Sequence, residues 1–204
     1  MITLHHPRIG RSIFTVWLLE EVGVDYQLEV YHRDENMRAP ESLKQIHPLG
    51  KSPVIDDEGL MLSESGAITT YILNKYDTKN KFGAADNSDA SKAELSQWIA
   101  YSEGSVFAPL LIKMFLLRSG VEHPIMTPFS DGELKLHFDH IANKLGHHEY
   151  ILGDKLSGAD FGIAFVTSMA KNLGQLDNYP TLGAYVDRIQ SRDAYIRAVE
   201  KAVE

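Results

Sequence analysis

The chain has 204 residues, of which 44% are hydrophobic and 24% charged, a balance typical of a soluble globular protein with one large or two small domains. The formal net charge of −8 argues against a nucleic-acid-binding surface, because such surfaces cluster lysine and arginine. The absence of cysteine excludes disulfides, thiolate metal ligands and a protein thiol nucleophile, so any sulfur chemistry must come from a substrate. Neither a secretory signal pattern nor a run of about eighteen apolar residues occurs, so we expect a cytoplasmic protein without membrane binding.

Residue patterns in the N-terminal part alternate between strand and helix. Strands are predicted at 2–5, 26–30, 52–56 and 60–62, and helices at 14–22, 40–46 and 68–76. Gly23 can end the first helix, and the segment Asp57-Glu-Gly59 is expected to join the last two strands as an antiparallel hairpin. The predicted order is therefore β-α-β-α-β-β-α.

A change in composition predicts a domain boundary. Residues 78–88 lack apolar periodicity and are rich in polar residues and glycine, which indicates a linker. We therefore expect an α/β domain at 1–77 and an all-helical domain at 89–204.

The second domain shows only helical patterns. Apolar residues recur at helical spacing in 95–106, 134–145, 161–168 and 181–203. Pro109 is expected to kink or end the first of these helices. In Ser157-Gly-Ala-Asp160, a hydroxyl and a carboxylate three residues apart predict a capping box, with Leu156 and Phe161 as its hydrophobic staple.

Four segments in sequence order resemble the glutathione transferase family, and the resemblance covers nearly the whole chain. They are Trp17-Leu-Leu-Glu-Glu-Val-Gly, His47-Pro-Leu-Gly-Lys-Ser-Pro-Val, Ser63-Glu-Ser-Gly-Ala-Ile and Leu152-Gly-Asp-Lys-Leu-Ser-Gly-Ala-Asp. The resemblance implies a thioredoxin-like domain followed by a helical bundle domain, which agrees with the split at the linker.

The resemblance also implies how glutathione is bound. A cis peptide is expected before Pro53, with the backbone of Ser52 pairing with the cysteinyl residue of glutathione. Its glycyl carboxylate would be bound by cations, for which the candidates are Lys51, His47 and Arg38.

The start of the helix after Ser63 suits the other end of glutathione on physical grounds. Helix N-termini present unpaired N–H groups and a partial positive charge, so Ser65 can offer its amide and hydroxyl to a carboxylate. Glu64 beside it can bind an ammonium group. Together they suit the zwitterionic γ-glutamyl group, whereas the alternative is that Ser65 only caps the helix and Glu64 is solvated surface.

The thiol-activating group is expected between the first strand and the first helix. Relatives often carry Ser-Arg-Ser-x-Arg there, whereas this chain has Gly10-Arg-Ser-Ile-Phe14 and loses the first Ser and the last Arg. We expect the helix N-terminus to stabilise the thiolate, with the Ser12 hydroxyl or the Arg11 guanidinium contributing. The alternative is that Ser12 is a simple N-cap.

Aromatic residues of the second domain are candidates for the electrophile pocket. Tyr101 and Phe107 are expected to line it between the domains, although Trp98 and Phe107 could equally be core residues. The function implied is transfer of glutathione to small hydrophobic electrophiles, as in detoxification, or hydroperoxide reduction, by a homodimer. The alternative is a noncatalytic binding or assembly module. The absence of cysteine argues against mixed-disulfide chemistry with glutathione.

Histidine clusters suggest a metal site only superficially. They are His5-His6, His147-His148, and Glu133 with His137 and His140. Adjacent histidines point apart on a helix and no thiolate is available, so we interpret them as core or surface histidines and expect no metal.

Overall fold

The computed structural model describes residues 1–8 and 10–203. The chain divides into two compact units, one made of Met1–Lys79 and Gln190–Glu204 and the other of Asn80–Ile189. The sequence assigned all residues of 89–204 to one helical domain, whereas the last helix belongs to the first unit. The first unit therefore includes a C-terminal segment that follows the whole second unit in the sequence.

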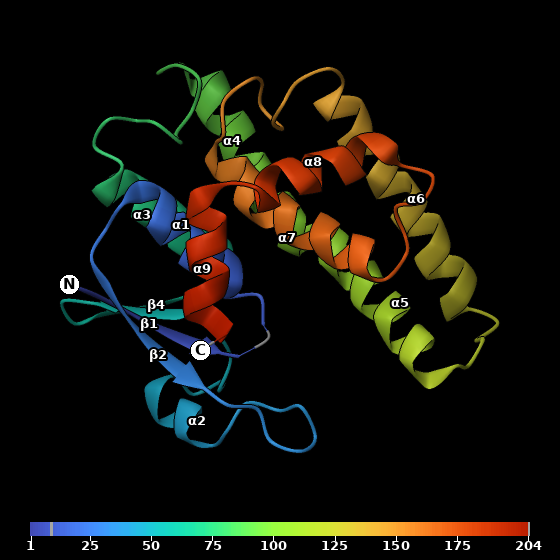
Figure 1. Ribbon diagram of the computed structural model, residues 1–204, viewed down its shortest axis with the longest axis horizontal. Helices are drawn as coiled ribbons and strands as arrows, with labels where there is room; N and C mark the ends of the chain where they lie inside the picture. The colour runs from blue at the N-terminus through green and yellow to red at the C-terminus, as the bar shows by residue number, and fades with distance from the viewer. Residues whose placement is uncertain (9, 204) are drawn as a thin grey trace. The chain divides into compact units, whose positions relative to one another are not determined.

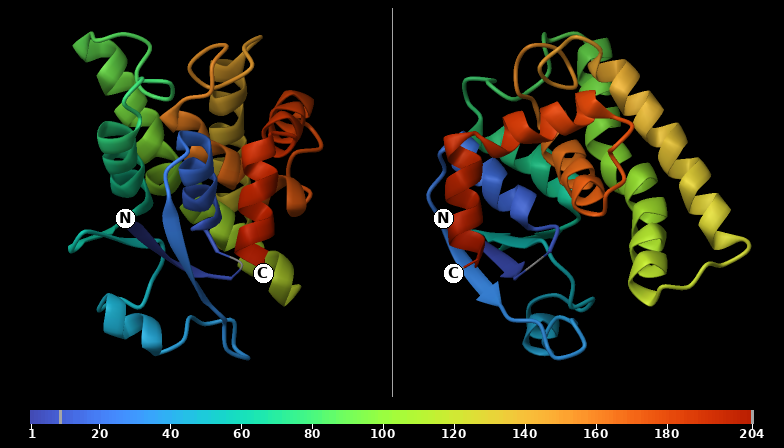
Figure 2. Two further views of the ribbon diagram at one scale, coloured as in Figure 1. Left: turned by 60° about the vertical axis from the view of Figure 1, so that its left-hand side comes forward. Right: turned by 45° about the vertical axis from the view of Figure 1, so that its right-hand side comes forward.

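The first unit is built on a four-stranded mixed sheet, and the predicted order β-α-β-α-β-β-α is confirmed. Its elements are β1 (Ile2–Pro7), α1 (Ile13–Val22), β2 (Tyr26–Tyr31), α2 (Ser42–Ile46), β3 (Val54–Asp57), β4 (Leu60–Ser63), α3 (Ser65–Tyr76) and α9 (Asp193–Val203). The strand order is β2-β1-β3-β4, in which β1 runs parallel to β2 and antiparallel to β3. Helices α1, α3 and α9 cover one face of this sheet, and α2 lies on the other (Figures 1 and 2). This is the thioredoxin-like arrangement.

Helix α9 is held on α1 by ion pairs. Glu21 accepts hydrogen bonds from the Nε and Nη2 atoms of Arg192 at 2.5 and 3.0 Å. Glu20 accepts from Arg197 at 2.9 Å and from Lys201 at 2.5 Å. Both carboxylate side chains are only 8% exposed, so these pairs are screened by water less than ordinary surface pairs.

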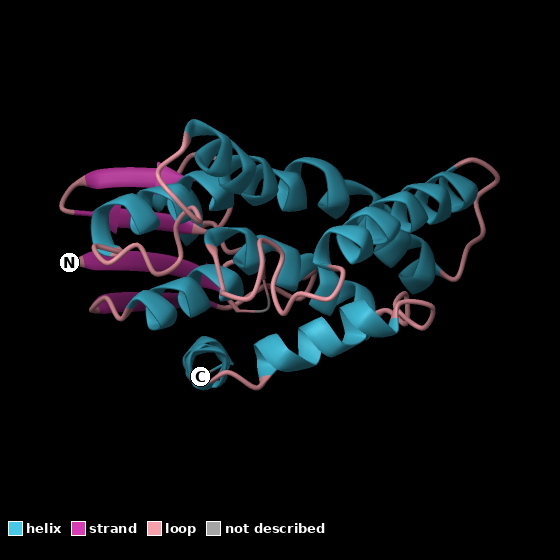
Figure 3. Cartoon of the chain, turned by 90° about the horizontal axis from the view of Figure 1, so that it is seen from above, coloured by secondary structure: helices cyan, strands magenta, loops and turns pink. Residues whose placement is uncertain are grey.

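The second unit is helical, and its elements are α4 (Asp89–Tyr101), the π-helical segment η1 (Ser102–Val106), α5 (Phe107–Ser119), α6 (Met126–Leu145), α7 (Gly158–Asn172) and α8 (Pro180–Gln190). Figure 3 shows that the strands all belong to the one sheet. The predicted capping box is present at the start of α7, where the buried Asp160 carboxylate accepts from the Ser157 N–H at 2.8 Å. The same carboxylate also accepts from Ile151 N–H at 2.9 Å and from the Tyr185 hydroxyl at 2.9 Å.

Pro109 neither ends nor interrupts the first long helix, because it is the third residue of α5. The preceding η1 segment is wider than an α-helix, and the Phe107 N–H donates to the Ser102 carbonyl five residues back. Proline lacks an N–H and crowds the carbonyl four residues before it, so a π-helical turn just ahead of Pro109 can accommodate the ring. By length and composition alone, the helical run from Asp89 to Ser119 could cross a membrane, a criterion that core helices also meet.

Helix α7 crosses the chain closely at Ser102, where the η1 segment begins. A Cβ atom added to Gly162 of α7 would lie 2.2 Å from the Ser102 Oγ and 2.9 Å from the Ser102 Cβ. Both residues are buried. Only glycine fits at this crossing.

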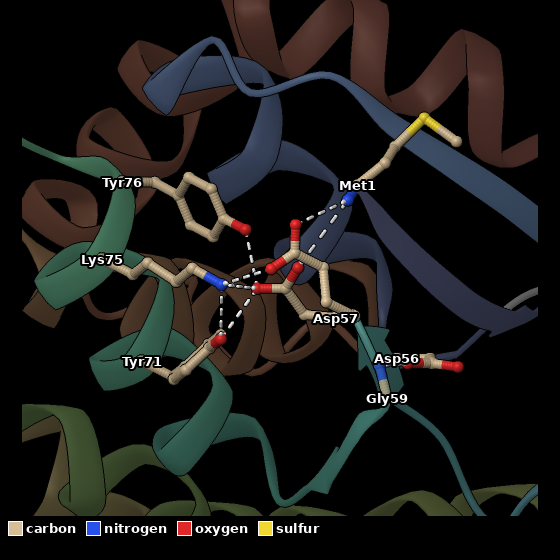
Figure 4. A network of polar contacts seen from close by, with 8 residues as sticks. Met1, Asp56, Asp57, Gly59, Tyr71, Lys75 and Tyr76 are labelled. Carbon is tan, nitrogen blue, oxygen red and sulfur yellow. Dashed lines mark hydrogen bonds and ion pairs between the residues drawn. The ribbon is translucent and has the colours of Figure 1, made fainter.

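A buried carboxylate joins the β3–β4 hairpin to α3. Asp57, at the end of β3, accepts hydrogen bonds from Tyr71 at 2.7 Å, Lys75 at 2.7 Å and Tyr76 at 2.6 Å, all from α3 (Figure 4). Burial alone would raise the pKa of Asp57, but these three donors outweigh it and lower the pKa to about 2. The network fixes the C-terminal half of α3 against the hairpin.

We expect Gly162→Ala to lower the free energy of unfolding by about 1–3 kcal/mol, because the added methyl overpacks the crossing of α7 with η1 at Ser102. Ser102→Ala in the same chain should recover part of the loss. Gly132→Ala in α6 is the matched control, since a Cβ there meets nothing within 4 Å and should stabilise the helix slightly. Urea unfolding of the four proteins tests this, and equal effects of the two glycine substitutions would contradict it.

Asp57→Asn should remove a pH-dependent contribution to stability. The folded pKa of about 2 lies below the ordinary value of 3.8, so the contribution is full above about pH 4 and is lost as the pH falls toward 2. The variant should be less stable than the unmodified chain by up to about 2 kcal/mol at pH 7 and nearly equal to it at about pH 2. Unfolding curves across this range test the prediction, with Asp56→Asn at the same turn as control. An Asp57→Asn variant whose stability still falls as steeply below about pH 4 would refute it.

Candidate functional site

The candidate residues of the first unit meet at one end of the sheet. In the strand register, Val54 lies between His5 of β1 and Ser63 of β4, and Pro7 at the end of β1 lies beside Tyr31 at the end of β2. The segments that follow β1, β2 and β4 and the segment that precedes β3 therefore leave the sheet at the same end. Functional groups far apart in the sequence are gathered there by strand pairing.

The segment before β3 is held against β1. The Ser52–Pro53 peptide is cis, as the resemblance implied, and Pro53 is buried. The Ser52 hydroxyl donates to the His5 carbonyl at 2.7 Å. This contact fixes the loop that ends β1 to the loop that begins β3.

The start of α3 has an unusual backbone. Glu64 adopts φ 71° and ψ 115°, a conformation that non-glycine residues rarely occupy and that costs about 1–3 kcal/mol. Its side chain is exposed, whereas Ser65, the first residue of α3, is 4% exposed. Within the described part of the chain, no group hydrogen-bonds to the Ser65 hydroxyl. A strained acidic residue thus stands beside a largely buried serine, whose hydroxyl is available to a ligand, at a helix N-terminus where backbone N–H groups are unpaired.

The start of α1 is organised differently. Ser12 precedes the helix with φ −62° and ψ −12° and makes no side-chain capping bond. Its hydroxyl lies 2.7 Å from the Nδ1 atom of His6, and both residues are wholly buried. The Ser12 hydroxyl therefore neither caps the helix nor is exposed to solvent. Arg11 beside it is half-buried.

Gly10 marks a close approach between two loops. A Cβ atom at Gly10 would come within 3.1 Å of the Pro7 carbonyl oxygen and 3.2 Å of the Arg33 Nη2. Arg33 donates from Nε to the Arg8 carbonyl at 3.1 Å and from Nη1 to the Met37 carbonyl at 2.8 Å. A serine side chain at position 10 would therefore be tightly packed against the Pro7 carbonyl and the Arg33 guanidinium, which favours glycine where the family pattern has its first Ser.

The remaining candidates sit on the surrounding loops. Lys51 and Arg38 are exposed and His47 is half-buried. The Arg38 backbone N–H donates to the Asp34 carboxylate at 2.8 Å, which closes the loop after β2. The His47 Nδ1 accepts from the Leu49 N–H at 3.4 Å.

The two candidates of the second unit lie on its first helical run. The Tyr101 hydroxyl is 2.6 Å from the His137 Nδ1 of α6, and burial raises the pKa of Tyr101. Phe107 is half-exposed and stacks on Phe165 at 6.1 Å. Trp98 is buried, as a core residue would be.

The sequence did not predict the structural contacts made by His6, Arg33 and Asp57. A signal for His6 existed, because Ile2, Leu4 and His6 alternate onto one face of a strand and two of them are plainly apolar. No local pattern identifies the contacts of Asp57 with α3, which are 14 or more residues away, or the contact of Arg33 with the Arg8 carbonyl, which is 25 residues away. Among the described residues, no group of three histidine, aspartate or glutamate side chains is arranged to hold a metal ion.

Comparison with known proteins agrees with this geometry. Residues 1–74 match the glutathione S-transferase N-terminal domain, and residues 121–197 match the glutathione S-transferase C-terminal domain. Glutathione S-transferase 1 of Saccharomyces cerevisiae is 31% identical, and the match covers 99% of this chain and 95% of the yeast protein.

Solved structures show the same likeness over the whole length. A glutathione S-transferase from Actinobacillus pleuropneumoniae superposes with a TM-score of 0.88 and 36% identity, over 99% of this chain and 93% of the other. A glutathione transferase homolog from Lodderomyces elongisporus, solved with two glutathione molecules per subunit, shares the fold with a TM-score of 0.82 at 20% identity, over 98% and 97% of the two chains. With both domain types matched and close relatives aligned end to end, the chain belongs to the glutathione S-transferase family.

Proposed function

We propose that this protein is a glutathione transferase, which binds glutathione at the loop end of the sheet and activates its thiol for attack on a small hydrophobic electrophile. The observation that carries the proposal is the start of α3, where Ser65, a largely buried residue whose hydroxyl makes no hydrogen bond to the described residues, adjoins the strained Glu64. Strain of this kind persists where the surrounding structure enforces it, commonly at ligand sites. The glutathione-bound relative from Lodderomyces elongisporus supports the choice of ligand.

The start of α3 would bind the γ-glutamyl group. The Ser65 hydroxyl and the first N–H groups of the helix suit its carboxylate, and the helix dipole favours a negative charge there. The exposed Glu64 carboxylate suits its ammonium group. The Glu64 carboxylate and the partially positive helix N-terminus, one residue apart, thus match the two charges of a zwitterion.

The rest of glutathione would lie along the loops beside β3 and β1. The Ser52 backbone, held by the His5 carbonyl, is the proposed partner of the cysteinyl residue. Exposed Lys51 is the first candidate for the glycyl carboxylate, with His47 and Arg38 as further cations.

Thiol activation is proposed to rest on positive charge at the start of α1. A free thiol has a pKa near 8.5, and lowering it by about two requires about 2.7 kcal/mol of preferential interaction with the thiolate. Because the Ser12 hydroxyl is buried against His6, the Arg11 guanidinium and the N-terminus of α1 are the favoured contributors. Ser12 then supports the turn instead of contacting sulfur.

In the proposed reaction, the thiol proton goes to solvent and the thiolate sulfur forms a bond to the electrophilic carbon, from which the leaving group departs with its electron pair. A hydroperoxide could replace the electrophile, and two glutathione molecules would then yield the disulfide, an alcohol and water. Tyr101 and Phe107 are the proposed contacts of the hydrophobic co-substrate. Cytoplasmic location, homodimer formation and a role in detoxification belong to the same proposal.

The second candidate is a noncatalytic glutathione-binding or assembly module. Its support is the β1–α1 loop, where the only hydroxyl of the expected window is buried and bonded to His6. Such a module would bind glutathione without lowering the pKa of its thiol.

Ser65→Ala should weaken glutathione binding by roughly tenfold to a hundredfold, because it removes a hydrogen bond to a carboxylate. Thr70→Ala is the matched control, since this exposed α3 hydroxyl donates to the Gly66 carbonyl within its own helix. Calorimetric titration, with thiolate absorbance followed in the same samples, tests binding and activation together. No binding by the unmodified chain would overturn the proposal, and binding without thiolate would favour the noncatalytic module.

Glu64→Gly should stabilise the fold while weakening glutathione binding. Glycine relieves strain of about 1–3 kcal/mol at φ 71° but adds backbone entropy of about 0.5–1 kcal/mol to the unfolded chain, so a net gain of roughly 1 kcal/mol is expected. Glu64→Ala is the comparison, because it removes the carboxylate and keeps the strain. Both variants should weaken glutathione binding to the same extent, whereas only the glycine variant should unfold at a higher denaturant concentration than the unmodified chain. A glycine variant less stable than the alanine variant would contradict the presence of strain at Glu64.

A further inference from the structure

His6 connects the end of the chain to the start of α1. It occupies the face of β1 shared with Ile2 and Leu4 and is 1% exposed. Its Nε2 lies 3.1 Å from the Ala202 carbonyl oxygen in the last turn of α9, and its Nδ1 lies 2.7 Å from the Ser12 Oγ. Residues separated by almost the whole chain are thus bridged by one imidazole ring.

The chemistry of the partners fixes the direction of both hydrogen bonds. A carbonyl oxygen only accepts, so the His6 Nε2 carries the hydrogen and donates it to Ala202. The Nδ1 of the neutral ring is then an acceptor, and the Ser12 hydroxyl donates to it. Burial lowers the pKa of His6 and outweighs the hydrogen bond to Ala202, which raises it, and the nearby charge of Arg33 also lowers it, so the ring is neutral at pH 7.

From this relay we infer that His6 is a positioning residue for thiol activation, an inference that rests on the proposed function. The ring holds Ser12 by its hydroxyl, and Ser12 directly follows Arg11, the half-buried cation at the proposed thiol position. The α9 carbonyl determines which ring nitrogen carries the hydrogen, so that Nδ1 faces Ser12 as an acceptor. A shift of about 1 Å at such a position is enough to cost catalysis about a hundredfold.

Two conservative substitutions separate the two halves of the relay. In His6→Asn, the amide oxygen can replace Nδ1 as acceptor for Ser12, whereas the side chain is too short to reach Ala202. In His6→Gln, the amide nitrogen can replace Nε2 as donor to Ala202, and the acceptor for Ser12 is lost. Ser12→Ala removes the same hydrogen bond from the other side.

The control must loosen α9 without touching this ring. Glu21→Gln does so, because it weakens the ion pair with Arg192 at the opposite end of α9. It should lower the unfolding temperature and leave the thiol unaffected. A loss of stability alone is thereby separated from a loss of positioning.

The measurement is the absorbance of bound thiolate against pH, with glutathione affinity and unfolding temperature recorded for each protein. We expect His6→Gln and Ser12→Ala to raise the pKa of the bound thiol by about 1, a tenfold smaller ratio of thiolate to thiol, while His6→Asn and Glu21→Gln stay near the unmodified protein. Titrations of His6→Gln and Ser12→Ala that coincide with the unmodified protein would overturn the inference alone. A lack of bound thiolate in the unmodified protein would overturn the proposed function and the inference with it.

Discussion

The antiparallel pairing of β3 between β1 and β4 is the constraint on which the candidate site depends. It places Val54 between His5 and Ser63, so the cis Ser52–Pro53 peptide and the start of α3 must leave the sheet beside the loop that follows β1. Because a slip of one residue would turn every side chain to the opposite face, burial of the strands also fixes this register. The groups proposed to bind the tripeptide glutathione are thus brought together by the backbone hydrogen bonds of the sheet.

The two helices that begin at this end of the sheet are anchored by different contacts. The C-terminal half of α3 is tied to the hairpin through Asp57, so the Ser65 hydroxyl can remain without a partner among the described residues. The outer side of α1 is tied to α9 through Glu20 and Glu21, and its start is tied to β1 through His6. Helix N-termini can be offered to a ligand only where the remainder of each helix is held by other contacts.

The sequence predicted those features of the fold that depend on interactions between residues close together in the chain. Apolar periodicity located the elements of the first unit, Gly23 ended α1 in a left-handed conformation, and Ser157 with Asp160 formed the capping box. Long-range docking left no such pattern. Among the α9 residues whose side chains are described, the buried ones are Ala194, Ala198 and Ala202, and ion pairs link the helix to α1. Small side chains and surface charges do not specify which neighbour they contact. The π-helical turn before Pro109 was not predicted, because the sequence shows the proline but not the wider turn that accommodates its ring.

The β1–α1 loop departs from the family pattern at Gly10. A Cβ atom there would lie 3.1 Å from the Pro7 carbonyl oxygen and 3.2 Å from the Arg33 Nη2, so a longer side chain would be tightly packed. In the proposed function, a cation takes the part of the serine hydroxyl. At an effective dielectric constant of about 20, a cation about 4 Å from a thiolate contributes about 4 kcal/mol. That exceeds the roughly 2.7 kcal/mol needed to lower the pKa of a thiol by about two. In the proposed function, charge at the start of α1 is therefore sufficient in magnitude without a serine hydroxyl, provided that Arg11 is held in place.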